Sequence, residues 1–253
     1  DAAIAFQAAV TTHPLPNHAN ASDLRVEPNA CLLFADGLRY DLGEALRDQL
    51  ESLGCRVSLE HRWSALPSVT ATAKPAITPV ANQISGNTVP EDFTPDFTAT
   101  GKPANAPNLR TALEGEGFQI LTGGMGDWPS SPEHRGWVEE GEIDTRGHQL
   151  QDDLPRSLHD EISRLAPRVV ALLDAGWTSV RIVTDHGWLL LPEGLPKVDL
   201  PRHLTISRWA RCAAIAGGSS VDVPTSPWHW NTSQHFATAP GIACFTSGNM
   251  YAH

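Results

Sequence analysis

Short apolar runs and amphipathic stretches alternate along the first part of the chain. Residues 30–35 form a continuous apolar run between Pro-Asn and Asp-Gly, which is typical of a strand buried on both faces. The leucines of residues 42–53 keep nearly helical spacing, and Gly54 is placed as a helix C-terminal cap. Residues 55–60 alternate like a second strand. The three segments together predict a βαβ unit.

The same patterns continue to the end of the chain. They predict further helices over residues 2–10, 108–116 and 155–174. They predict further strands over residues 118–121, 182–184, 212–216 and 241–245. Because helices and strands alternate, we expect an α/β fold, namely a three-layer αβα sandwich around a mainly parallel sheet.

Two segments are poor in periodic pattern. Residues 1–29 begin with a helix candidate and continue with Pro, Asn and Ser, so we interpret them as an N-terminal lead-in and linker. Residues 86–108 are a long stretch with little periodicity, which indicates a lid, a family-specific insertion or a disordered loop. The predicted domain therefore covers residues 30–253.

Composition and charge limit the classes of protein. The net charge of −11 excludes a nucleic-acid-binding face over the whole surface, although a bound cation could still accept a phosphate group. No apolar run approaches the roughly 18 residues of a membrane span, and no signal peptide is visible. The four cysteines form no Cys-x-x-Cys pair, which favours core positions in a reducing cytoplasm. The start at Asp1 without Met suggests a fragment that lacks flanking domains.

Residues able to bind a metal follow two predicted strands. Asp185 and His186 come directly after residues 182–184, and Asp36 comes directly after residues 30–35. Ligands bind at the carboxyl ends of strands in open parallel sheets, so the position suits a metal site. Asp-Gly is also ordinary turn chemistry, which would explain Asp36 without any function. Both interpretations stay open for each residue taken alone.

Other candidate groups lie between and beyond these strands. Residues 66–75 are rich in hydroxyls, which could cap a helix or present a nucleophile to a phosphate, and these two roles are compatible. Asp144 and His148 are four residues apart, so one helical turn could bring both onto one ion. Trp228-His229-Trp230 lacks basic neighbours, which favours packing over base stacking.

The order of these motifs resembles the alkaline phosphatase superfamily, and more narrowly the PglZ domain. The residues that carry the resemblance are Asp36-Gly37-Leu38-Arg39-Tyr40-Asp41, Pro67-Ser68-Val69-Thr70-Ala71-Thr72, Thr184-Asp185-His186-Gly187-Trp188 and Tyr251-Ala252-His253. It covers about residues 30–253. PglZ domains occur in bacterial phage-defence systems of the BREX type and in some response regulators. The resemblance implies an alkaline-phosphatase-like fold.

The resemblance also implies a site with two divalent ions, zinc first, with manganese or magnesium as alternatives. One ion would be held by Asp36, Thr70, Asp185 and His186. The second would be held by Asp144, His148 and His253. Thr70 would be the nucleophile and form a phospho-enzyme, with Ser68 as the competing nucleophile. Arg39 and Lys74 would bind phosphate oxygens, or else be ordinary members of salt bridges.

The expected function is therefore hydrolysis of phosphodiesters, in oligonucleotides or DNA, by the catalytic domain of a larger phage-defence protein. Its partners would be other proteins of the defence system. Within enzymes, the alternative is a phosphomonoesterase or phosphomutase, because metal ligands alone do not distinguish these reactions. An alternative of another class is a non-catalytic scaffold that helps to assemble the defence complex.

Overall fold

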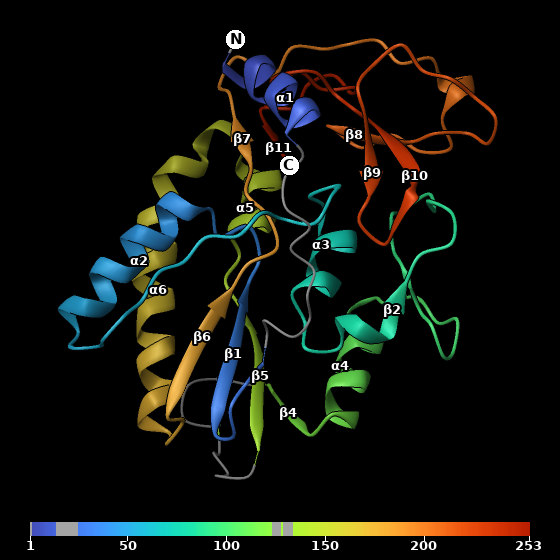
Figure 1. Ribbon diagram of the computed structural model, residues 1–253. Helices are drawn as coiled ribbons and strands as arrows, with labels where there is room; N and C mark the ends of the chain where they lie inside the picture. The colour runs from blue at the N-terminus through green and yellow to red at the C-terminus, as the bar shows by residue number, and fades with distance from the viewer. Residues whose placement is uncertain (1, 14–24, 123–127, 129–133) are drawn as a thin grey trace.

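A four-stranded parallel sheet organises the fold (Figure 1). The computed structural model describes residues 2–13, 25–122, 128 and 134–253. The strand order is β4-β5-β1-β6. The strands are β1 (Ala30–Ala35), β4 (Phe118–Leu121), β5 (Arg135–Glu140) and β6 (Ser179–Val183). β1 pairs in parallel with both β5 and β6, so the predicted α/β class with a parallel sheet is confirmed.

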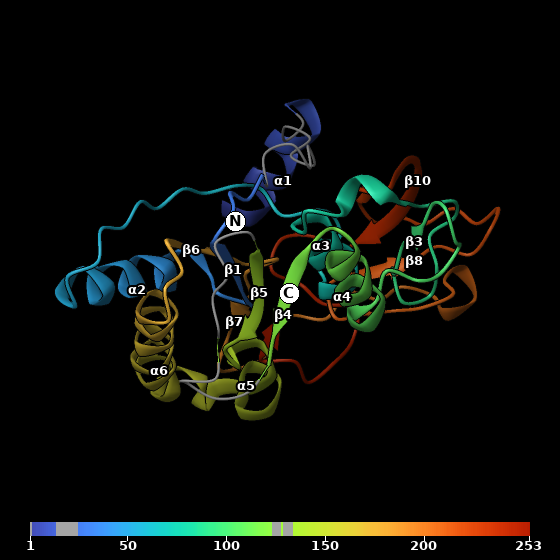
Figure 2. The same cartoon turned by 90° about the horizontal axis from the view of Figure 1, so that it is seen from below.

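Helices cover both faces of this sheet, as Figure 2 shows from below. On one face, Cys31 and Leu33 of β1 pack with helices α2 (Tyr40–Ser52) and α6 (Leu154–Asp174). On the other face, Leu32 and Phe34 pack with helix α4 (Ala106–Gly115). Every residue of β1 is buried, as expected for an apolar run without alternation.

Helix α2 follows its sequence pattern closely. Leu42, Leu46 and Leu50 are buried at four-residue spacing, which places them on one face of the helix. Gly54 has φ of 86°, a left-handed conformation that glycine adopts without steric cost, and its N–H bonds to the carbonyl of Glu51. The predicted C-terminal cap is therefore confirmed.

Smaller antiparallel units complete the fold. One sheet has the order β8-β10-β9, from β8 (Cys212–Ala214), β9 (Thr225–Trp228) and β10 (Asn231–Thr238). The pair β7 (Leu189–Leu190) and β11 (Tyr251–Ala252) joins residues far apart in sequence. β2 (Ile84–Ser85) precedes the long loop predicted for residues 86–108, and it pairs with β3 (Asp96–Phe97) inside that segment.

The remaining helices are short. They are α1 (Ala2–Thr12), α3 (Thr70–Ala76) and α5 (Ile143–Leu150), with single 3₁₀ turns at η2 (Ala81–Gln83), η3 (Gln151–Asp153) and η4 (Arg202–Leu204). The lead-in helix is thus confirmed, whereas most of the predicted linker, residues 14–24, lies outside the described residues. Within the described part of the chain, no helix is both long and apolar enough to cross a membrane.

Two strand predictions are wrong. Residues 55–60 alternate in burial but form no ladder, because Cys55 and Val57 pack as single side chains on the core beside α2 and α6. Residues 241–245 form a turn that begins at Gly241 with φ of 57°, and Cys244 makes only an isolated bridge to Lys197. The β-strands beside β1 are β5 and β6, so its parallel partners come from much later in the chain.

Candidate metal centre

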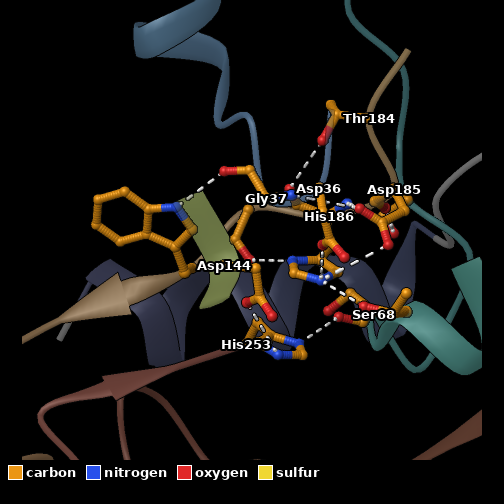
Figure 3. Close-up of polar contacts among 12 residues, drawn as sticks. Asp36, Gly37, Ser68, Asp144, Thr184, Asp185, His186 and His253 are labelled. Atoms are coloured by element: carbon orange, nitrogen blue, oxygen red, sulfur yellow. Dashed lines mark hydrogen bonds and ion pairs between the residues drawn. The ribbon is translucent and has the colours of Figure 1, made fainter. Parts of the chain in front are cut away.

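The strand ends bring the candidate ligands together (Figure 3). Asp36 directly follows β1, and Asp185 and His186 follow β6, its neighbour in the sheet. Asp144 lies in α5, which follows β5 on the other side of β1. His253 follows β11. Because parallel strands end at the same edge of a sheet, side chains from distant parts of the sequence converge there.

His186 lies at the centre of the first group of ligands. Its Nε2 is 3.3 Å from Asp36 Oδ1 and 3.7 Å from Asp185 Oδ2. The hydroxyl of Thr70 lies 3.1 Å from the same nitrogen. Ligand atoms of Asp36, Asp144 and His186 all lie within 4.8 Å of one another, which is close enough for one ion. Asp144 thus also approaches the first group, although the sequence assigned it only to the second ion.

The second group combines Asp144, His148 and His253, whose ligand atoms also lie within 4.8 Å. Asp144 Oδ2 is 3.6 Å from His148 Nε2, and Asp144 Oδ1 is 3.4 Å from His253 Nε2. The two histidine nitrogens are 3.3 Å apart. Asp144 and His148 occupy one turn of α5, so the expected four-residue spacing on a helix is present.

Two histidines are held with Nε2 directed into the cluster. His186 Nδ1 lies 3.2 Å from the carbonyl oxygen of Gly187, and His253 Nδ1 lies 3.2 Å from that of Ser68. A carbonyl only accepts, so Nδ1 carries a hydrogen in both rings, and Nε2 is the ring nitrogen that faces the cluster. Metal-ligating histidines almost always donate their other ring N–H in this way.

Two buried carboxylate oxygens also fit a cation. Asp36 Oδ1 and Asp185 Oδ2 are buried, and among the described residues they accept no hydrogen bond, although both face His186 Nε2. The other oxygen of Asp185 accepts bonds from the backbone N–H groups of His186 and Gly37, which fixes the orientation of the carboxylate. A buried carboxylate oxygen that accepts no hydrogen bond is costly, and metal coordination is one way to compensate it. The Asp and His residues present could therefore hold a metal ion.

Burial and charge shift the pKa values of the cluster in different directions. Burial raises the pKa of Asp185 to about 6. Burial alone would lower the pKa of His186, but the carboxylates around it, Asp36 first, raise it to about 9. Burial, together with the neighbouring His186, lowers the pKa of His253 to about 4. The rings of His186 and His253 stack 3.9 Å apart, so the two imidazoles oppose each other's protonation.

Thr70 and Ser68 meet the cluster through different atoms. Thr70 is the first residue of α3, and its hydroxyl points to His186. Ser68 instead contacts the cluster through its backbone carbonyl, which faces His253. The N-cap position of α3 is Val69, with no side-chain cap bond, so the Thr70 hydroxyl does not serve as that cap.

The two predicted phosphate-binding cations are both ion-paired. Arg39 makes two hydrogen bonds to the carboxylate of Asp41, at 2.6 and 2.7 Å, and its guanidinium lies over the Trp188 ring. Lys74 is buried, and its Nζ lies 2.8 Å from Glu139 Oε2. The structure thus favours the salt-bridge alternative for both residues as they stand.

Some residues around the site had no predicted role. Tyr251 donates a hydrogen bond to Asp144, and Trp188 donates one to the carbonyl of Gly37. Trp228 and Trp230 bond to Thr72 in α3, which supports the packing interpretation of the Trp-His-Trp run. The motifs containing Tyr251 and Trp188 were visible in the sequence, but no spacing rule showed which atoms their side chains reach.

The fold and the site define an α/β protein with Asp and His groups, at the carboxyl edge of a parallel sheet, that could hold metal ions. A scan of family models found no match to this chain, and a search of curated proteins also found none.

Proposed function

We propose that this chain is a PglZ-like, metal-dependent phosphodiesterase domain with an alkaline-phosphatase-like fold. The observation that carries the proposal is the convergence of six Asp and His side chains and one hydroxyl at one edge of the sheet. The donor set of carboxylate oxygens and imidazole nitrogens suits zinc, with manganese or magnesium as alternatives.

The division of ligands follows the two groups described above. Asp36, Asp185 and His186 would hold the ion beside Thr70, and Asp144, His148 and His253 would hold the other. When bound, the ions supply positive charge that lowers the pKa of the Thr70 hydroxyl and neutralises the phosphate. Asp144 approaches both groups, so its carboxylate would help to fix their separation.

The chain's own part in the reaction centres on Thr70. Its proton passes to solvent, and Oγ1 attacks phosphorus while the opposite ester bond breaks and an alcohol leaves. Water then hydrolyses the threonine phosphodiester, which releases a phosphate monoester and restores the hydroxyl. The hydrogen bonds of Asp185, His186 and His253 to the backbone keep these side chains in place throughout.

The ion pairs of Arg39 and Lys74 favour a diester over a monoester. Both side chains are already neutralised by carboxylates, Asp41 and Glu139 respectively. A diester carries one negative charge and a monoester carries up to two, so a site whose own side chains add no uncompensated cation to the two ions suits the diester better. An oligonucleotide or DNA strand is the proposed substrate class. The proposed setting is the cytoplasm, in a larger phage-defence protein with other defence proteins as partners.

The test compares two substrates after the metal content has been measured. We expect metal-loaded protein to hydrolyse an activated bis-aryl phosphate faster than the mono-aryl phosphate. Thr70→Ala and Asp185→Ala should each abolish turnover, whereas the matched control Ser68→Ala should keep it. Preference for the monoester would indicate a phosphatase or mutase instead. If metal-loaded protein turns over neither substrate, both enzyme functions are excluded and the non-catalytic scaffold is the remaining alternative.

A further inference from the structure

A buried tyrosine lies against the second group of ligands. The Tyr251 hydroxyl donates a hydrogen bond of 2.8 Å to Asp144 Oδ1, and the whole residue is only 1% exposed. The same oxygen faces His253, while the other oxygen of Asp144 faces His148. The phenol therefore sets the rotation of the carboxylate between the two histidines.

The tyrosine ring packs directly against α5 at Gly147. A Cβ added to Gly147 would lie 2.2 Å from Tyr251 Cε2, so only a glycine lets the ring lie this close to the helix. The ring also meets His148 edge-on at 5.1 Å and contacts the Trp188 ring at 5.4 Å. Gly147 lies three residues after Asp144 on α5, which brings the hydroxyl to the carboxylate.

The backbone of Tyr251 is hydrogen-bonded to Gln151, the residue that follows α5. Gln151 Oε1 accepts hydrogen bonds from the N–H groups of Met250 and Tyr251, at 2.9 and 3.0 Å. Gln151 Nε2 donates to the carbonyl of His148. Gln151 itself has φ of 52°, which is uncommon for a residue other than glycine. The side chain and the backbone of Tyr251 thus both connect β11 to α5.

We propose that Tyr251 is a positioning residue that orders Asp144, His148 and His253 to bind the second ion. This inference rests on the proposed function, because it assumes that the cluster binds metal. The residue touches no ion itself and acts through the Asp144 carboxylate. Loss of a hydrogen bond to a ligand typically lowers metal affinity by about 10- to 100-fold.

The test is a zinc titration of metal-free protein by calorimetry. We expect wild-type protein to bind two equivalents. Tyr251→Phe should bind the second about 10- to 100-fold more weakly, with a smaller loss for the first, because Asp144 also approaches the first group. Tyr40→Phe is the matched control, because Tyr40 is the other tyrosine of the chain and is 48% exposed, and it should bind zinc as wild type does. The unfolding temperature of each metal-free variant shows that it is folded.

The possible results separate this inference from the proposed function. Unchanged affinity for both equivalents in Tyr251→Phe would overturn the positioning role and leave the proposed function intact. Equal weakening of both equivalents would also overturn it, because Tyr251 lies against both Asp144 and His148 of the second group, whereas only Asp144 approaches the first. Wild-type protein that binds no zinc would overturn both proposals.

A second variant covers the case in which Tyr251→Phe does not fold. Gln151→Ala removes the acceptor for the Tyr251 N–H group but keeps the phenol. We expect the same selective weakening of the second zinc equivalent, and unchanged affinity would overturn the inference.

Discussion

Replacing Glu139 with glutamine removes the carboxylate that Lys74 and Arg110 share. Glu139 accepts hydrogen bonds from Lys74 at 2.8 Å, from Arg110 at 3.0 and 3.1 Å, and from Trp137 at 3.2 Å. Burial opposes its charge, but these partners lower its pKa from 4.5 to about 2. That difference corresponds to roughly 3 kcal/mol of stabilisation of the folded state at neutral pH.

Removing the Glu139 carboxylate should cost more unfolding free energy than removing the Lys74 ammonium. Glu139→Gln leaves the Lys74 ammonium buried over the Phe34 ring without its carboxylate, so we expect a loss of about 3 kcal/mol in unfolding free energy. Lys74→Met should cost only about 1 kcal/mol, because Glu139 keeps Arg110 and Trp137. The double variant should be more stable than Glu139→Gln alone, because it contains no unpaired ammonium.

The assay is urea unfolding at a series of pH values. The pKa of Glu139 is lowered by folding, so its stabilisation is complete above pH 4.5 and is lost as the pH falls toward 2. The difference between wild type and Glu139→Gln should therefore shrink over this range. If Lys74→Met costs as much as Glu139→Gln, or if the difference is the same at pH 7 and pH 3, the reasoning is refuted.

Three further predictions concern the surroundings of the site. Gly147→Ala should destabilise the fold by about 1–3 kcal/mol, measured by urea unfolding, because its Cβ would lie 2.2 Å from the Tyr251 ring; an unchanged midpoint would contradict this close packing. Trp230→Phe should lower the unfolding free energy by about 1 kcal/mol in the same assay, because it loses the hydrogen bond from the indole N–H to the Thr72 carbonyl. Trp63→Phe, at an exposed position, is the control. If the cluster binds zinc, chelation should lower the unfolding temperature and added zinc should restore it; at a free concentration 100 times the Kd the stabilisation is about 2.7 kcal/mol. No shift on chelation of metal-loaded protein would contradict that prediction.

The parallel sheet was predictable because short apolar runs in the sequence mark its strands. Residues 30–35 are apolar at every position and bounded by turn residues, and β1 has these bounds. The alternation at residues 55–60 led to a wrong strand prediction. An extended segment that packs every second side chain on a core has this pattern whether or not it pairs with another strand. Strand pairing depends on distant segments, which a local pattern does not contain.

The candidate ligands were predictable for a similar reason, since Asp36 and Asp185 follow strands that end at one edge. What the sequence did not contain was the direction of individual side chains. Lys74 was proposed as a phosphate ligand, yet it lies on the face of α3 that meets Glu139 at the end of β5. The phenol of Tyr251 reaches Asp144 from β11, which pairs with β7 and is distant from Asp144 in sequence.

The pairing of β11 with β7 also has a consequence for the order of events during folding. Asp36, Asp185 and His186 all precede β7, so the first group of ligands can form once the chain has been made through β6 and its following turn. His253 follows β11, so its group forms only when β11 is in place, and the segment that it closes from His148 is 105 residues long. The first group closes a longer segment, 148 residues between Gly37 and Asp185, so the two groups differ by the position of β11 and not by loop length; metal binding stabilises only a completed group. If the cluster binds zinc, uptake during folding would therefore occur in two steps, and the second step would report the docking of β11.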